Sequence, residues 1–322
     1  MIPYYLEDFS NGRARRNSVH QFPNPGELRL FAEFLENMKH RKYDPAQCRD
    51  PIIRNHRLCN ALRKWDRGSR DIVAMGERCS NWKFFLFWSI LQRRFLRNGL
   101  LEQFVDPDDV TSIAIRRVLV CHRRSMPMRG TWPSTLDKGI SEMSDLWRVI
   151  SSFGDDVKDL DFDRIFDAFH RVTAPSHQWS QGASCSHAVF WIYQVCLDLA
   201  QLEVPRVIGA SERLSLAKKL SSFRYIGEGC VGALMTIFRY DGGGLSSCEL
   251  YQMQKEGRSG ALSFLLGVLT ESMGGQTRWL FGKKFNLHEM QFVLCEYRKY
   301  LLHAAGLRPL PRYVPFLERE KR

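Results

Sequence analysis

Long apolar runs are missing from this sequence of 322 residues. The densest one, Phe84 to Leu91, is followed directly by Gln92, Arg93 and Arg94, and it is far shorter than the ~20 residues that a membrane-spanning helix needs. The N-terminal segment has neither a basic start nor an apolar core, so it lacks the pattern of a secretory signal. We therefore expect an intracellular protein of the nucleus or cytoplasm, neither secreted nor bound to a membrane.

Paired cysteines are also missing. The nine cysteines are scattered and odd in number, and no two of them form a Cys-x-x-Cys motif. Because neither a zinc ribbon nor a disulfide framework is indicated, we expect a reducing compartment and no metal or other cofactor.

Acidic residues are fewer than basic ones, 35 against 47, which leaves a net charge of +12. Only 13 of the basic residues are lysines and 34 are arginines, the residue type favoured where forked donors must hold phosphate. The segment 141–170 has eight acids and three bases, so the positive charge is localised elsewhere. This balance favours a nucleic-acid partner over the alternative, a basic protein whose arginines simply face solvent.

Strand patterns bounded by tight turns are nearly absent, whereas apolar residues recur three and four apart along most of the chain. We expect an all-α fold with one helical domain over residues 26–305, an irregular basic arm at 1–25 and a C-terminal tail at 306–322. Helical spacing begins at Glu27 and recurs over Asn55–Trp65, Trp82–Phe95, Asp109–Val120, Ser141–Phe153, Phe162–Val172, His187–Leu202, Ser211–Ser221 and Leu287–Ala305.

The first candidate motif, at residues 50–67, places an asparagine among arginines. Four polar side chains fall within one arc of about 80° on a helical wheel, namely Asn60, Arg63, Arg67 and Arg70. Such a face is suited to holding an anion. The alternative is a solvated helix face with ion pairs such as Arg63–Asp66.

The second motif is the glycine-rich turn Gly227-Glu228-Gly229 before an apolar helix, which has the shape of a helix-hairpin-helix turn. Glycines permit a positive φ, and the amides that begin the next helix can hold a DNA phosphate. The alternative is a helix C-cap that leads into a buried helix. A dinucleotide fingerprint is disfavoured, because the preceding Leu216–Phe223 is predicted to be helical rather than a strand.

The third motif is the loop at 256–262, where glycines bracket Arg258 and Ser259 before the apolar helix Ala261–Leu269. It offers a guanidinium beside helix-terminal amides, again a combination that suits an anion. A later segment at 294–300 contains Cys295, for which a buried structural thiol is the common role.

Taken together, these segments resemble a helical family linked to hypermodified thymine in DNA. The family comprises the 5-hydroxymethyluracil DNA kinase helical domain and the α-glutamyl/putrescinyl thymine pyrophosphorylases. The similarity covers about residues 28–302. The matching segments are Asp-Pro-Ile-Ile at 50–53, Arg-Leu-Cys-Asn at 57–60, Arg-Lys-Trp-Asp-Arg at 63–67, the glycine turn at 227–233, the loop at 256–262, and Leu-Cys-Glu-Tyr-Arg-Lys-Tyr at 294–300, with Tyr297 in the family's Phe position.

Three departures accompany this resemblance. The loop at 256–262 lacks the family's Pro, and Cys230 follows Gly229 where the family tends to have Pro. The acid expected at the end of the next helix is replaced by Arg239, with Asp241 two positions later. If this acid serves the chemistry, Asp241 substitutes for it.

The resemblance implies a DNA-glycosylase-like helical fold and an enzyme that acts on a modified thymine or uracil base in DNA. The base would be 5-hydroxymethyl-derived and activated by a pyrophosphoryl group, and a transferase would replace that group with a small amine nucleophile. Two alternatives stay open: a non-catalytic DNA-binding relative that reads modified or damaged bases, and a glycosylase-type hydrolase.

We expect the motifs to converge on one pocket. The predicted catalytic residues are Asp241, Arg57, Asn60 and Arg63. The predicted substrate- and phosphate-binding residues are Arg67, Gly227, Gly229, Arg258 and Ser259. Three further residues are expected to pack nearby, Asp66, Glu296 and Lys299, with pairing of Glu296 to Lys299 and of Asp66 to Arg63 as the structural alternative.

Overall fold

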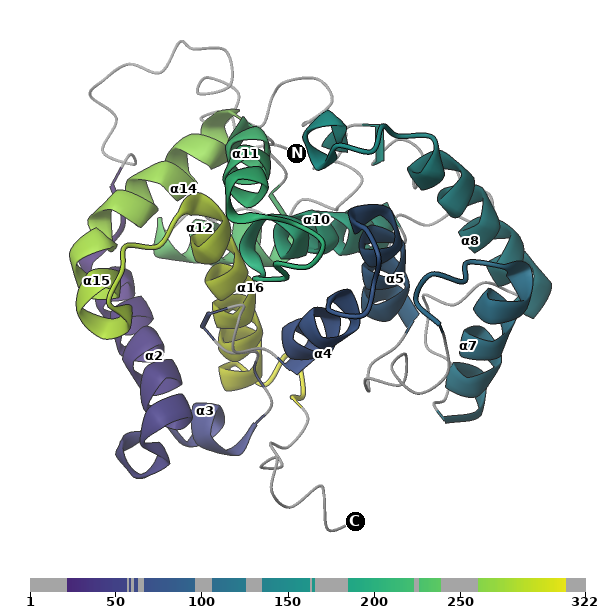
Figure 1. The fold of residues 1–322 in the computed structure, drawn as a ribbon. Helices are drawn as coiled ribbons and strands as arrows, with labels where there is room; N and C mark the ends of the chain where they lie inside the picture. Colours follow the sequence, from purple (N-terminus) through teal and green to yellow (C-terminus); the bar gives the residue numbers. More distant parts are fainter. Residues whose placement is uncertain are drawn as a thin grey trace. The chain divides into compact units, whose positions relative to one another are not determined.

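The computed structural model describes residues 22–56, 58, 61–62, 67–95, 106–125, 135–162, 164–165, 185–222, 226–238 and 260–310. Within these ranges the regular structure is helical and no strand occurs (Figure 1). The predicted all-α class is therefore confirmed, while the DNA-glycosylase-like arrangement and the helix-hairpin-helix turn stay predictions. Over the same ranges, no helix combines the length and the apolar character that crossing a membrane requires.

The chain divides into two compact units. One, which we call the terminal unit, combines residues Met1–Trp65 with Arg224–Arg322, and the other, the central unit, is formed by Asp66–Phe223. The single domain predicted over residues 26–305 stays a prediction.

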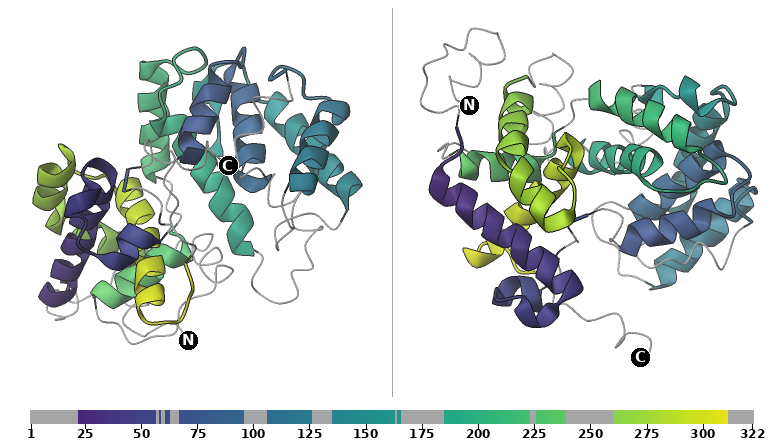
Figure 2. Two further views of the ribbon diagram at one scale, coloured as in Figure 1. Left: turned by 90° about the horizontal axis from the view of Figure 1, so that it is seen from below. Right: turned by 60° about the vertical axis from the view of Figure 1, so that its left-hand side comes forward.

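The terminal unit packs around the last long helix. In the described part of this unit, helices α12 and α16 lie side by side, α2 contacts α12 and α15, and α14 contacts α16 (Figures 1 and 2). The rings of Phe31 and Phe34 on α2 lie 4.9 and 5.1 Å from the ring of Tyr297 on α16, and all three residues are buried. The elements are α2 (Pro25–Tyr43), η2 (Pro45–Gln47), α3 (Pro51–Asn55), α12 (Glu228–Ile237), α14 (Gly260–Ser272), α15 (Gly274–Phe281) and α16 (Leu287–Ala304).

Local signals set the ends of these helices. The Asn24 side chain accepts hydrogen bonds from the amides of Gly26 and Glu27, and Pro25 follows at the first helical position of α2. Helix α16 begins with a reciprocal capping box between Asn286 and Glu289. These caps satisfy backbone donors that have no partner inside the helix.

The central unit is built around helix α5. This helix contacts α4, α8 and α10, while α7 packs on α8 and α11 packs on α10. Its apolar face includes Phe85, Phe87 and Trp88, all fully buried. The elements are α4 (Arg67–Gly76), α5 (Trp82–Phe95), α7 (Ser112–Ser125), α8 (Leu136–Ser151), η4 (Val157–Asp159), α10 (Cys185–Gln201) and α11 (Ala210–Ser222).

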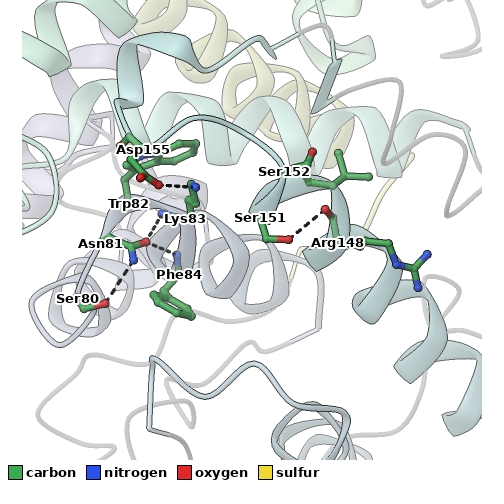
Figure 3. Close-up of polar contacts among 10 residues, drawn as sticks. Ser80, Asn81, Trp82, Lys83, Phe84, Arg148, Ser151, Ser152 and Asp155 are labelled. Carbon is green, nitrogen blue, oxygen red and sulfur yellow. Dashed lines mark hydrogen bonds and ion pairs between the residues drawn. The ribbon is translucent and has the colours of Figure 1, made fainter.

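The start of α5 is joined to the loop that follows α8 (Figure 3). The Asn81 side chain accepts hydrogen bonds from the amides of Lys83 and Phe84 and so caps the helix. Trp82 Nε1 donates to the carbonyl of Asp155 at 2.8 Å, and the Lys83 ammonium donates to the Asp155 carboxylate at 2.9 Å.

The helix predicted over Asn55–Trp65 is wrong. Helix α3 ends at Asn55, His56 is extended with φ −119° and ψ 154°, and residues 61–62 form a bend. The reason is tertiary: Leu58, Ala61 and Leu62 are buried in the core of the terminal unit, which a continuous surface helix does not satisfy. The bend at 61–62 lies between α3 and α4, which begins at Arg67, so one continuous helix over 55–65 is not present.

Candidate functional site

The first and last sequence motifs meet in the terminal unit. The Tyr300 hydroxyl on α16 donates a 2.7 Å hydrogen bond to Asp50 Oδ2, across 250 residues of sequence. The other oxygen of Asp50 accepts from the amides of Ile52 and Ile53 at 2.8 and 3.0 Å, so the same carboxylate caps α3. Burial, and then the hydrogen bond to Asp50, raises the pKa of Tyr300, which keeps the hydroxyl protonated as the donor.

A buried arginine holds the backbone on both sides of Arg57. Arg41 on α2 is only 7% exposed, and its guanidinium donates to the carbonyls of Ile53, His56 and Leu58 at 3.3, 3.4 and 2.9 Å. A buried guanidinium needs acceptors, and here three backbone carbonyls supply them. The path of the chain into and out of position 57 is therefore fixed by α2.

The glycine motif at 227–233 also lies in the terminal unit. Its glycines are needed for close packing between helices, not for unusual backbone angles. Gly227 is the N-cap of α12 with φ −71°, so the left-handed conformation is not used there. A Cβ at Gly229 would lie 3.1 Å from the Cα of Cys295, and a Cβ at Gly232 would lie 2.7 Å from Nε of Arg298. These two glycines let α12 approach α16 closely.

The closing motif contributes a buried carboxylate. Glu296 is 3% exposed and accepts a 2.5 Å hydrogen bond from the ammonium of Lys299, whose side chain is 35% exposed. The pairing of Glu296 with Lys299, stated above as the structural alternative, is therefore present. The two residues lie on the same helix as Cys295, which packs on Gly229.

The thiols at this contact are not activated nucleophiles. Burial raises the pKa of Cys295 to about 12, while the Lys299 charge lowers that pKa and the Glu296 charge raises it by smaller amounts. Burial, and next the neighbouring Cys295, raises the pKa of Cys230 well above its usual value. Cys230 is buried and Cys295 is half-buried, and both thiols stay protonated at neutral pH, as expected of structural cysteines.

Tyr297 is a buried polar group that the core does not satisfy. In the part of the chain that the structure describes, its hydroxyl is enclosed and has no hydrogen-bond partner. Burial raises the pKa of this hydroxyl, so it is neutral at physiological pH.

One member of the arginine clusters has a structural role in the central unit. Arg93 donates two 2.9 Å hydrogen bonds to the fully buried Asp198 and a third to Ser69 Oγ, joining α5 to α10 and α4. Arg93 is thereby committed to the core rather than to a phosphate. Arg116 and Arg117 on α7 are exposed.

Four of the predicted site residues lie in the described part of the terminal unit: Gly227, Gly229, Glu296 and Lys299. Arg67 is the first residue of α4 in the central unit, and its side chain is not described. The other predicted positions lie outside the described residues, namely Arg57, Asn60, Arg63, Asp66, Asp241, Arg258 and Ser259.

Sequence reasoning missed Arg41, although a signal for it exists. Phe31, Phe34, Leu35 and Met38 form the buried face of α2, and Arg41 continues their three-and-four spacing. A basic residue at a core position must find acceptors nearby, which marks it as a residue that organises its surroundings.

No known protein family, curated protein or solved structure matches this chain. Among the described residues, no group of three or more His, Cys, Asp or Glu side chains is arranged to hold a metal ion.

Proposed function

We propose that this protein binds DNA and acts on a modified thymine or uracil base whose 5-methylene carbon carries a pyrophosphoryl group. The observation that supports this proposal best is the Tyr300–Asp50 hydrogen bond, because it joins the two most specific motifs of the resemblance. The packing of Gly229 on Cys295 brings the glycine motif to the same unit.

In the proposed reaction, the bond between the 5-methylene carbon and the pyrophosphate oxygen breaks, and pyrophosphate leaves with the electron pair. A small amine forms a new carbon–nitrogen bond and loses a proton, which Asp241 would accept as a carboxylate. The guanidinium groups of Arg57 and Arg63 would stabilise the negative charge of the departing pyrophosphate. Asn60 would hydrogen-bond to the base or to a phosphate oxygen.

The scaffold around position 57 supports this assignment. Catalysis by charge stabilisation depends on donors that are held in place before the reaction begins. Arg41 donates to the carbonyls of residues 53, 56 and 58, and Asp50 caps α3, the short helix that contains the first of them. The described backbone on either side of position 57 is thus held by a buried arginine and a half-buried aspartate.

The test is to incubate the purified protein with duplex DNA that carries pyrophosphoryl-activated 5-hydroxymethyluracil and a small amine such as putrescine. We expect release of inorganic pyrophosphate and a nucleoside whose mass has gained the amine. Arg57→Ala and Asp241→Asn should abolish release, whereas Arg29→Ala, which removes an exposed arginine paired with Glu33, should not change it.

Absence of both products with the wild-type protein would contradict the transferase reaction. Tight binding of the modified duplex without release of pyrophosphate would instead favour the non-catalytic relative that reads modified bases. A free base with no amine adduct would favour the glycosylase-type hydrolase.

A further inference from the structure

A tryptophan on the surface of the terminal unit lies beneath a lysine from another helix. Trp279 on α15 is 67% exposed, and Nζ of Lys39 on α2 lies 5.6 Å from the centre of its ring. The two helices pack against each other (Figure 1). A tryptophan is usually highly buried, so an aromatic surface of this size left in water is informative.

Further aromatic and basic residues lie on the two helices that carry Lys39 and Trp279, or directly after them. Tyr43, 61% exposed, follows Lys39 by one turn on α2, where side chains four residues apart are neighbours. Arg278 precedes the tryptophan and is exposed. Beyond Gly282, whose φ of +73° ends α15, come Lys283 and Lys284, with side chains about half exposed.

Acidic groups face part of this surface. Lys283 is paired with Glu289, and Lys284 lies 4.0 Å from Glu271. Glu36 lies one turn before Lys39 and pairs with His40. The charge around the ring of Trp279 is therefore set by Lys39 and Arg278, while the lysines beyond Gly282 are compensated.

We propose that Trp279 is a stacking platform for a base of single-stranded nucleic acid, with Lys39 binding the adjacent phosphate. An exposed aromatic ring beside cations is the combination that holds unpaired bases, because every base offers a face for stacking and every phosphate a charge. Bases in a duplex are stacked on one another and do not present such a face. A flexible lysine over an exposed ring is held more weakly than a stacked base, so the base displaces Lys39 toward the phosphate.

This inference rests on the proposed function in one respect only, that the partner is a nucleic acid. It adds a surface outside the motifs at 50–67, 227–233 and 294–300. A strand opened to expose one base for chemistry has unpaired neighbours, and Trp279 is suited to hold one of them.

The test is fluorescence anisotropy with the full chain and a labelled thymidine oligonucleotide about 20 nucleotides long. Trp279→Ala should weaken binding by about 5- to 150-fold, and Trp279→Phe should retain most of the affinity because phenylalanine also stacks. The salt dependence should not change in Trp279→Ala, because the side chain carries no charge. Lys39→Gln should flatten the slope of log K against log salt by about 0.7, the value for one phosphate contact on a single strand.

Phe22→Ala provides the matched control, since Phe22 is an aromatic of the same unit that is 73% exposed, and this variant should bind the oligonucleotide like the wild type. The inference would be overturned if the wild type did not bind the oligonucleotide, or if Trp279→Ala bound it as tightly as the wild type. Equal affinities would favour a protein partner for Trp279. Release of pyrophosphate from the modified duplex is a separate measurement. Its failure contradicts the transferase reaction while leaving a Trp279-dependent affinity for single strands intact.

Discussion

The Tyr300 hydroxyl and the Asp50 carboxylate are joined by a 2.7 Å hydrogen bond, and Tyr297, one turn earlier on the same helix, has a buried hydroxyl that no described residue satisfies. Replacing tyrosine by phenylalanine should therefore change the free energy of unfolding in opposite directions at these two positions. This contrast gives the first two predictions.

Tyr300→Phe should lower the free energy of unfolding by about 1.5–3 kcal/mol, because a hydrogen bond to an ionised carboxylate is lost. Urea unfolding followed by circular dichroism measures the change. Phe22→Leu, at an aromatic residue of the same unit that is 73% exposed, is the control and should stay within about 0.5 kcal/mol of the wild type. A Tyr300→Phe variant as stable as this control would show that the bond does not contribute.

Tyr297→Phe should raise the free energy of unfolding by about 0.5–1 kcal/mol. The substitution removes a buried hydroxyl whose loss of hydration is not compensated, and it keeps the ring that packs on Phe31 and Phe34. Urea unfolding of Tyr297→Phe, followed by circular dichroism, measures this change. Destabilisation would indicate that the hydroxyl has a partner that the described residues do not include.

Gly229→Ala should destabilise the terminal unit by about 1–3 kcal/mol, because the added methyl group meets the backbone of Cys295 at 3.1 Å. Gly267→Ala on α14 is the matched control, since no atom lies within 4 Å of its added Cβ. That variant should be stabilised by up to about 1 kcal/mol through helix propensity. If both variants melt alike, close packing of α12 on α16 is not the reason for the glycine.

Asp198→Asn should cost about 3–5 kcal/mol, because it leaves the Arg93 guanidinium without its carboxylate in the core of the central unit. The matched control is Asp145→Asn, which weakens the surface ion pair between Asp145 (42% exposed) and Arg148 (78% exposed) and should change stability little. Thermal unfolding of both variants is the measurement. A small effect of Asp198→Asn would mean that Arg93 finds other acceptors.

The alkaline limit of stability should depend on the buried tyrosines. Burial raises the pKa of both Tyr297 and Tyr300 above the ordinary value near 10, so folding opposes their ionisation. Their contribution to the free energy of unfolding is complete below about pH 10. It is lost as the pH rises further, because the unfolded chain then releases protons that the folded chain retains. Absorbance titration at alkaline pH should show one fewer late-titrating tyrosine in Tyr300→Phe than in the wild type.

The sequence predicted most of the described helices because their apolar spacing is local information. Helix α5 begins and ends where the pattern predicts, and α16 ends one residue earlier than predicted. Asn24 and Asn286 act as caps through contacts within a few residues, which a sequence pattern contains.

The features that the sequence analysis predicted wrongly or missed depend on contacts between distant segments of the chain. The segment after Asn55 leaves the helix because Leu58, Ala61 and Leu62 enter a core formed by α2, α12 and α16. Arg93 has the same local pattern as a surface arginine, and only the distant Asp198 gives it a structural role. The structure places Asp50, Gly229 and Tyr300 in one unit. The predicted convergence of the site residues on one pocket stays a prediction, because it depends on positions outside the described residues, such as Arg57 and Asp241.

The division of the chain also sets an order of events during synthesis. The terminal unit needs α2 and α16, yet all of residues 66–223 are translated between them. The central unit has its whole sequence available first and is free to fold as the chain emerges, since domains fold as units during translation. Meanwhile the apolar face of α2, with Phe31 and Phe34, waits for the residues of α16 that will cover it. Helix α2 therefore stays uncovered while residues 66–223 are translated, which makes it a segment that chaperones have reason to bind.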